Sequence, residues 1–281
     1  MKSLAKQKFW KVSVSLLINC ILLAGAIFMV IPFAWMLSTS LKPLTEVFTY
    51  NIQWLPSNPT FDGYRQVWKQ LPFARMYFNS AFVAATITAV QLATCTLAAY
   101  AFARLRFPGR DVLFLGYVAT MMIPAQVTMI PSFLLIRKLG IMDSYFALIL
   151  PFLAHPFGTF LLRQFMLTLP VSLEDAALLD GCTRFQILRK IVVPLSRPAL
   201  STMGLFTFLF SWNDFMWPLI VTNRQTMRTL QVGLALLRTE QGTQWPMLMA
   251  ATVLAILPLL VGFLFAQKQF IEGITLTGIK G

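Results

Sequence analysis

Long stretches without charged residues alternate with short polar segments along this chain. Six apolar runs contain no Asp, Glu, Lys or Arg, except for Asp214 in the fifth run. The runs cover residues 12–41, 76–103, 112–136, 144–162, 198–223 and 241–267. A helix that crosses the hydrocarbon of a bilayer needs about 20 mostly apolar residues, and each run supplies that number or comes close to it. The pattern therefore predicts an all-α integral membrane protein with six transmembrane helices, in contact with membrane lipid.

The composition agrees with this class. Of the 281 residues, 57% are hydrophobic and 12% are charged, whereas soluble domains carry about 25% charged residues. The net charge is +13, but the basic residues lie at the ends of the apolar runs and form no stripe that would bind nucleic acid. Because no linker or low-complexity segment divides the chain, we expect residues 1–281 to form a single transmembrane domain.

The distribution of Lys and Arg predicts how the chain is oriented. The side that holds both termini and the segment after residue 162 carries 14 basic residues, and the opposite side carries 9. The more positive side faces the cytoplasm, so both termini are expected there.

The basic start of the chain could also belong to a signal peptide. The apolar core of such a peptide has about 7–15 residues, and the first run is about twice as long, which favours a retained helix.

The long segment 38–77 is expected outside the cytoplasm. It is rich in Pro and aromatic residues, among them Trp54 and Trp68. Aromatic side chains favour the membrane–water interface, and a docking surface for an extracytoplasmic partner is the alternative interpretation. Prolines also recur inside the apolar runs, as at Pro124 and Pro156, which indicates kinked or broken helices.

The charged segment at about 170–198 predicts a helical hairpin. Ser172 is suited to cap a first helix, and Glu174 and Asp175 would lie in its first turn, where the helix dipole favours negative charge. Gly181 is the residue type that ends a helix in the left-handed conformation. The pattern therefore places a short helix between Ser172 and Gly181.

A second short helix is expected directly afterwards. Thr183 and Gln186 have the spacing of a capping box, and Pro194 is expected to end the helix. The hairpin could be a loop that folds back on its own membrane domain, or a surface that docks on a partner through its narrow Ala176–Ala177 face. It lacks the third helix and the basic face of a helix-turn-helix that reads DNA.

Several stretches resemble one family of transport proteins. Asp175-Ala176-Ala177, Asp180-Gly181 and Ile191-Val192-Val193-Pro194 resemble the EAA loop in the permease subunits of bacterial ABC importers. Residues 99–109, 212–220 and 277–281 are similar to the carbohydrate-uptake branch, specifically to its maltose-type second permease. The chain departs from the family at Asp175, where Glu is usual, and at Val193, where Leu is usual.

The resemblance implies a type I importer permease fold in which the hairpin couples the membrane domain to an ATPase. The residues that it assigns to this coupling are Glu174, Asp175, Ala176, Ala177, Asp180 and Gly181. Which of the two carboxylates carries the contact stays open. A tail formed by Gly278, Lys280 and Gly281 resembles a family segment that reaches toward the ATPases, and a frayed terminus is the alternative.

The same resemblance implies a set of partners. They are a second homologous permease, two cytoplasmic ATPase subunits and an extracytoplasmic substrate-binding protein. ATP and magnesium would be bound by the ATPase subunits, and no cofactor or metal by this chain. The sequence itself has no G-x-x-x-x-G-K-[ST] loop for nucleotide phosphates, and no nucleophile–base pair or cluster of metal ligands indicates an enzyme.

Polar side chains in the fifth apolar run are candidates for a substrate path. Asp214 lies beside Trp212, Asn213 and Trp217, and polar residues within a membrane span are commonly functional. A sugar path would use polar groups next to aromatic faces. Alternatively, Asn213 and Asp214 cap a break between helices. The lone His155 is interpreted as a hydrogen-bonding residue in helix packing.

Together these observations predict a permease subunit of a binding-protein-dependent ABC importer in the bacterial inner membrane. The resemblance implies a sugar or oligosaccharide as cargo, or a related polyol phosphate such as glycerol 3-phosphate. The main alternative is a stand-alone secondary transporter in which Asp214 couples transport to protons. A membrane scaffold without a transport role is a third possibility.

Overall fold

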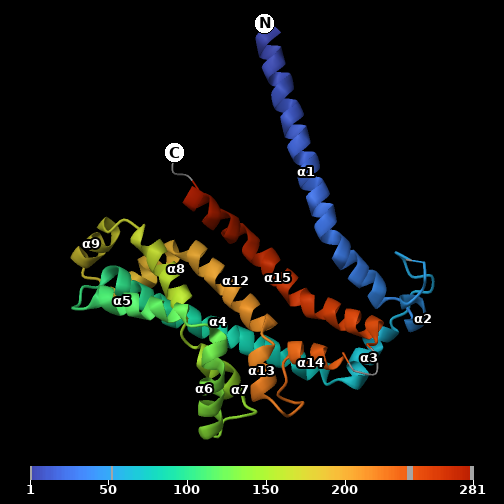
Figure 1. Cartoon of the computed structure of the whole chain (residues 1–281). Coiled ribbons are helices and arrows are strands. Elements are labelled where there is room, and N and C mark those ends of the chain that lie inside the picture. Colours follow the sequence, from blue (N-terminus) through green and yellow to red (C-terminus); the bar gives the residue numbers. More distant parts are fainter. Residues whose placement is uncertain (1, 52, 239–242, 279–281) are drawn as a thin grey trace. The chain divides into compact units, whose positions relative to one another are not determined.

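The computed structural model describes the backbone of residues 2–51, 53–238 and 243–278. Side chains are described in these ranges except at residues 2–9, 11–12, 265–266 and 268–278. Within this part of the chain the regular elements are helices, and no strand occurs. The all-α prediction is therefore confirmed (Figure 1).

Three helices are long and apolar enough to cross a membrane as continuous elements. They lie within α1 (Lys2–Ser40), α4 (Phe73–Arg104) and α15 (Trp245–Gly278). Pro32 and Pro258 fall inside α1 and α15 without ending either helix. Three bent pairs of helices also meet the criteria of length and composition, so that the described residues contain up to six spans if each pair forms one span, in agreement with the prediction.

Each of the three bent pairs breaks at a short connection. The first joins α5 (Arg110–Ala119) and η1 (Thr120–Met122) to α6 (Ala125–Lys138) with a bend of 96°. The second joins α7 (Tyr145–Ile149) and η2 (Leu150–Phe152) to α8 (Pro156–Leu167) at 44°. The third joins the helical segment Arg184–Leu195 to α12 (Arg197–Asn213) at 79°. Pro124 precedes α6 and Pro156 begins α8, because a proline has no N–H to donate and suits a helix start.

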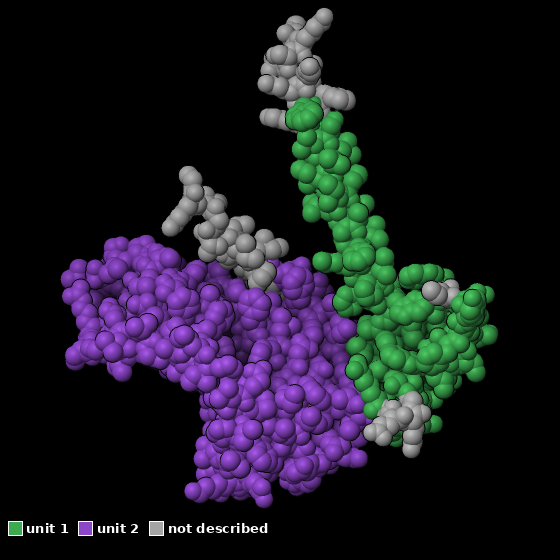
Figure 2. Space-filling view, viewed as in Figure 1, with its two compact units in different colours: residues 1–71, 237–254 green, residues 72–236, 255–281 purple. Residues whose placement is uncertain are grey.

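The chain divides into two compact units, drawn in different colours in Figure 2. Unit 1 comprises residues 1–71 and 237–254, and unit 2 comprises residues 72–236 and 255–281. Helix α15 begins in unit 1 and continues in unit 2. The expectation of a single transmembrane domain stays a prediction.

In unit 1, the start of the segment predicted outside the cytoplasm is folded against the end of α1. It contains α2 (Leu44–Val47) and α3 (Asp62–Gln70). Lys42 is 3% exposed and its Nζ lies 4.3 Å from the ring centroid of Trp35. The hydroxyl groups of Ser40 and Tyr64 are 2.9 Å apart. Polar and aromatic contacts therefore order part of this segment.

Gly63 lies where α3 passes close to the backbone at the beginning of α15. A Cβ at Gly63 would lie 2.8 Å from the carbonyl oxygen of Pro246 and 3.3 Å from that of Ser40. Backbone atoms cannot move aside as the end of a side chain can, so Gly63→Ala is expected to destabilise the protein by about 1–3 kcal/mol. Thermal unfolding of the purified protein measures this effect. Gly116→Ala on α5 is the matched control, because its Cβ would meet no described atom within 4 Å.

In unit 2, α4 is the central helix. One cluster of buried residues joins its C-terminal half to α8, α12 and the segment 177–192, and includes Ala99, Leu162 and Met203. A second cluster joins its N-terminal half to α6, α7 and α13 (Met216–Val221). Another short helix, α14 (Leu230–Leu236), follows α13. Figure 1 shows α9 beside α5 and α8 at one end of this unit, and α6, α7 and α13 at the other.

Candidate functional site

The predicted hairpin is present and begins with α9 (Ser172–Leu179). The prediction that Ser172 caps this helix is wrong. The capping position is Val171, whose carbonyl oxygen accepts hydrogen bonds from the backbone N–H groups of Glu174 at 2.9 Å and Asp175 at 3.0 Å. The helical turn starts earlier because Pro170 already provides an acceptor to Leu173 at 3.4 Å. Ser172 therefore lies inside the first turn.

Gly181 ends α9 as predicted. Its φ angle is +81°, in the left-handed region that favours glycine. The N–H of Cys182 donates to the carbonyl of Ala177 at 2.9 Å, and the N–H of Gly181 donates to that of Leu178 at 3.1 Å. These two bonds form a Schellman motif, which satisfies the free carbonyl groups at the end of a helix. The turn between the two helices of the hairpin therefore depends on a glycine conformation.

The second helix begins with the predicted capping box. The side chain of Thr183 accepts from the N–H of Gln186 at 3.3 Å, and the Gln186 side chain accepts from the N–H of Thr183 at 2.7 Å. The helical segment consists of α10 (Arg184–Ile187), the π-helix η3 (Leu188–Val192) and α11 (Val193–Leu195).

The prediction that Pro194 ends this helix is wrong, because the segment continues to Leu195. Pro194 lies in the first turn of α11 after the π-helical turn. The chain turns at Ser196, whose N–H donates to the carbonyl of Val192 at 2.8 Å.

The inner face of the hairpin is anchored in unit 2. Ala177, Ile187 and Val192 belong to the same buried cluster as residues of α4, α8 and α12. Ala177 is 7% exposed, whereas its neighbour Ala176 is exposed. Adjacent residues of a helix point about 100° apart, so the two alanines, expected to share one docking face, lie on different sides of α9.

Glu174 also lies on this inner face, where it forms an ion pair with Arg104 at the end of α4. The distance between Arg104 Nε and Glu174 Oε1 is 2.7 Å, and the two side chains are 7% and 5% exposed. Arg104 Nη2 donates to the carbonyl groups of Met166 at 2.6 Å and Leu169 at 2.7 Å. The hydroxyl of Tyr100 donates to Glu174 Oε2 at 3.4 Å. We call Arg104 and Glu174 the buried clamp.

The outer face of the hairpin carries a mixture of acidic and apolar side chains. Asp175 and Asp180 are exposed, Leu179 is 90% exposed and Phe185 is 64% exposed. Of the two carboxylates between which the sequence left the contact open, Asp175 is on the accessible surface and Glu174 is buried. The assignment of these residues to an ATPase contact stays a prediction.

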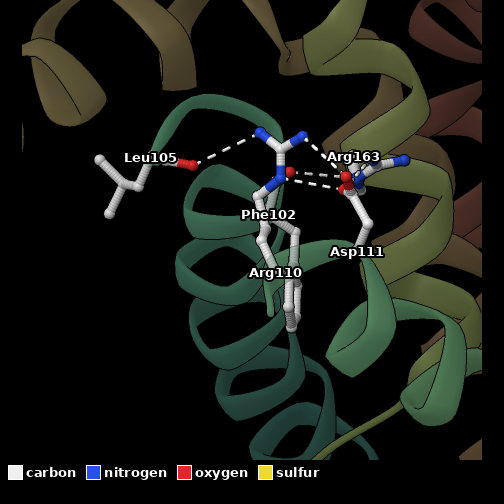
Figure 3. A network of polar contacts seen from close by, with 5 residues as sticks. All are labelled: Phe102, Leu105, Arg110, Asp111 and Arg163. Carbon is white, nitrogen blue, oxygen red and sulfur yellow. Dashed lines mark hydrogen bonds and ion pairs between the residues drawn. The ribbon is translucent and has the colours of Figure 1, made fainter. Parts of the chain in front are cut away.

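A second polar network connects α5 with the ends of α4 and α8 (Figure 3). Arg110 Nε donates to Asp111 Oδ1 at 3.0 Å, and Arg110 Nη1 donates to the carbonyl of Leu105 at 3.5 Å. Arg163 Nε donates to the carbonyl of Phe102 at 3.2 Å, and its Nη2 lies 3.9 Å from Asp111 Oδ1. The Asp111 side chain is 72% exposed. This network is more open to solvent than the buried clamp.

The residues predicted to line a substrate path separate into two groups. Trp212 is 1% exposed and its indole donates to the carbonyl of Ala255 at 3.1 Å. Trp217 is 5% exposed and its indole donates to the carbonyl of Ala147 at 2.9 Å. Both rings are part of the packed interior of unit 2 in this conformation.

Asn213 and Asp214 lie at the break between α12 and α13. Asp214 Oδ1 accepts from the N–H of Trp217 at 3.4 Å, and Asn213 Nδ2 donates to the carbonyl of Leu209 at 2.9 Å. These bonds fit the interpretation that the pair caps a helix break. Asp214 also lines a cavity of about 360 Å³ in unit 2. A contact with substrate stays a prediction for both residues.

The cavity is lined mainly by apolar residues together with a few polar groups. Its polar lining residues besides Asp214 are Ser80, Gln91, His155, Thr207, Ser211 and Thr229. His155 caps α8, since its Nδ1 accepts from the N–H of Gly158 at 3.3 Å. This agrees with its interpretation as a structural hydrogen-bonding residue.

In the predicted tail, Gly278 is the last residue of α15, and Lys280 and Gly281 lie outside the described residues.

Comparison with known proteins identifies one family and several relatives. The family described as "Binding-protein-dependent transport system inner membrane component" matches residues 92–272. The arabinooligosaccharides transport system permease protein of Bacillus subtilis is 38% identical over 253 residues, which cover 89% of this chain and 90% of that protein. The sulfoquinovosyl glycerol transport system permease protein of Agrobacterium fabrum is 36% identical over 263 residues, with coverage of 93% and 91%.

A solved structure has the same fold. It is a crystal structure of a bacterial ABC transporter involved in the import of the acidic polysaccharide alginate. The match has a TM-score of 0.81 and 28% sequence identity, and it covers 90% of this chain and 95% of the other.

Proposed function

Because this chain belongs to the family of inner membrane components of binding-protein-dependent transport systems, we propose that it is moved by cytoplasmic ATPase subunits bound to its hairpin. The chain is a permease subunit of an ABC importer with membrane-spanning helices. In the proposed assembly it pairs with a second, homologous permease and with two ATPases. A substrate-binding protein delivers the cargo from outside.

The observation that carries this proposal is the two-sided construction of the hairpin. Its inner face is anchored through Ala177 and Glu174, while Asp175 and Leu179 are exposed on the outer face. An apolar side chain that is 90% exposed beside acidic groups is suited to a partner that offers an apolar groove with basic residues. Asp175 is therefore our choice for the charged contact to the ATPase.

The proposed mechanism requires that ATP binding favours one conformation of the permease over another. A ligand shifts a conformational equilibrium only by the difference in its binding free energy for the two states. The ATPases would bind ATP and magnesium, close on each other and carry the hairpin with them. Movement of the hairpin would then change the side from which the membrane helices are open. Both termini and the hairpin would lie in the cytoplasm.

The proposed cargo is a sugar or an oligosaccharide, and a related polyol phosphate comes next. The relatives support this class, since they are named as permease proteins for arabinooligosaccharides and for sulfoquinovosyl glycerol. Gln91, Thr207 and Asp214 are among the polar groups that such a cargo would meet in the cavity of unit 2. The cargo class rests on these relatives and not on the shape of the cavity.

Affinity purification of the tagged chain from its native membrane tests the assembly. Mass spectrometry is expected to identify an ATPase and a second permease in the purified material. Uptake of labelled arabinooligosaccharides and of sn-glycerol 3-phosphate by membranes that contain the assembly tests the cargo class. Recovery of the chain alone, with uptake that depends on the proton gradient, would contradict the proposal and favour a secondary transporter that uses Asp214.

A further inference from the structure

The buried clamp joins three helices through one guanidinium group. Arg104 ends α4, Glu174 belongs to α9, and the carbonyl groups of Met166 and Leu169 lie at the end of α8 and just beyond it. We infer that Arg104 and Glu174 pass the movement of the hairpin to α4 and α8. The inference rests on the proposed function, because it assumes that an ATPase moves the hairpin.

Electrostatics makes this contact hard to separate. Both side chains are more than nine-tenths buried, and charges attract more strongly in a protein interior than in water. Pulling Glu174 away from Arg104 would leave two buried charges without compensation, which is strongly unfavourable. The carbonyl groups at the end of α8 also hold the guanidinium of Arg104, because the C-terminal end of a helix favours a positive charge. A displacement of α9 is therefore accompanied by α4 and α8.

The other contacts of the hairpin do not fix its position as firmly. Ala177, Ile187, Leu188 and Val192 are held by apolar packing, and the hydrophobic effect has no preferred direction. By contrast, Arg104 Nε lies 2.7 Å from Glu174 Oε1 in an ion pair, and two hydrogen bonds from Nη2 of the same guanidinium to the carbonyl groups of Met166 and Leu169 fix its position. The clamp, together with the Tyr100 hydroxyl that donates to Glu174 Oε2 at 3.4 Å, therefore provides directional contacts between the inner face of the hairpin and the two membrane helices.

Helix α4 extends from the clamp to the cavity. Gln91 lies 13 residues before Arg104 on this helix, a distance of about 20 Å along a rigid α-helix. Gln91 Nε2 donates to the carbonyl of Phe152 at 2.6 Å, and Gln91 Oε1 accepts from Thr207 at 3.2 Å. This one amide connects α4 to the break before α8 and to α12. A shift of α4 therefore changes the wall of the cavity.

The structure thus gives the two adjacent carboxylates different tasks. Asp175 points to the surface that would receive the ATPase, and Glu174 holds the membrane helices. Variants of the clamp are expected to keep the ATPase bound and to lose the response of the membrane domain to ATP. A loss of both properties would instead assign Glu174 to docking.

The test uses the assembly of tagged chain and co-purified ATPase in lipid nanodiscs. The reporter is Ser211→Cys in the cavity wall, in a background where Cys20, Cys95 and Cys182 are replaced by alanine. The rate of labelling by N-ethylmaleimide is measured without nucleotide and with ATP and vanadate. Allosteric couplings between sites commonly correspond to factors of about 5–150, so we expect ATP to change the rate at least about fivefold in the parent protein.

Two variants and one control are compared on this background. Glu174→Gln removes the negative charge with little change of shape, and Arg104→Lys keeps the positive charge but loses the fork that reaches three acceptors. If Glu174→Gln does not fold, Arg104→Lys still tests the inference. Asp111→Asn removes an exposed carboxylate at the same end of α4 and α8, and it is expected to behave like the parent protein.

The clamp variants are expected to retain the ATPase and to label at the same rate with and without ATP. A parent-like response to ATP in both variants would overturn the inference. Loss of the bound ATPase in the variants, with Asp111→Asn unaffected, would also overturn it, because the clamp would then serve docking. If ATP did not change the labelling rate in the parent protein, the inference would also be overturned, because the cavity wall would show no movement for the clamp to transmit. Failure of the parent chain to capture any ATPase would instead contradict the proposed function.

Discussion

Replacing Gly181 by valine is expected to reduce ATP-driven uptake at least about tenfold while the chain still inserts into the membrane. Gly181 has a φ angle of +81° and closes the Schellman motif between the two helices of the hairpin. The left-handed conformation costs an L-residue roughly 1–2 kcal/mol, and a β-branched residue is especially unfavourable there. Since about 1.4 kcal/mol corresponds to a factor of ten, the substitution would make the native turn about tenfold less favourable relative to other conformations of the hairpin. Uptake by membranes containing the assembly measures the effect.

The control for this prediction is Gly181→Asn. Asparagine adopts the left-handed conformation more readily than most residues, and a Cβ at this position would meet no described atom within 4 Å. The asparagine variant is therefore expected to retain most of the uptake. If valine and asparagine reduced uptake equally, the effect would depend on the added side chain and not on the backbone, and the role of the turn would be wrong.

Replacing Leu179 by aspartate is expected to weaken binding of the ATPase at least about 30-fold. Leu179 is 90% exposed on the outer face of the hairpin, so the substitution does not disturb the core of unit 2. In the proposed interface the apolar groove that receives Leu179 would bury the new carboxylate, which costs several kcal/mol. A cost of about 2 kcal/mol already corresponds to this loss of affinity. Titration of the purified chain with the purified ATPase measures it.

Leu139→Asp provides the matched control. Leu139 is also an exposed leucine, 55% accessible, and it follows α6 in unit 2. Figure 1 shows α6 at the end of this unit away from α9. An equal loss of affinity in both variants would indicate a general effect of a new negative charge, and the hairpin would no longer be identified as the docking surface.

Local sequence signals predicted the hairpin well. The capping box at Thr183 and Gln186 and the glycine turn at Gly181 depend on residues within a few positions of each other. Such signals state which backbone groups lack a partner and which side chain supplies one. The same local reasoning was wrong at Ser172, because Pro170 had already started the turn, and at Pro194, because a π-helical turn lies before it.

Contacts between distant segments could not be predicted from the sequence. Arg104 and Glu174 are 70 positions apart, and only the packing of α9 against α4 and α8 brings them together. In the sequence, Arg104 served as one of the positive charges that indicate orientation. The sequence showed that Arg104 lies at the end of an apolar run, but it did not indicate with which residue Arg104 forms an ion pair. The separation of Ala176 from Ala177 likewise depends on which face of α9 meets the core.

The burial of the two tryptophans has the same origin. Trp212 and Trp217 stand beside polar residues in the sequence, which suggested a path for sugars. In the fold, each indole instead donates to the carbonyl of a residue on another helix. A sequence does not reveal which face of a membrane helix is turned to the interior when every face is apolar.

Site-specific photocrosslinking from the hairpin in the native membrane tests the central claim most directly. A photoreactive phenylalanine analogue is placed at Leu179, or at Leu139 as the comparison, and the crosslinked partner is identified by mass spectrometry after irradiation. The proposed coupling predicts an ATPase subunit crosslinked from position 179 and none from position 139. Crosslinking of position 179 only to lipid or to this chain itself would contradict the account, since the outer face of the hairpin would then have no ATPase bound to it.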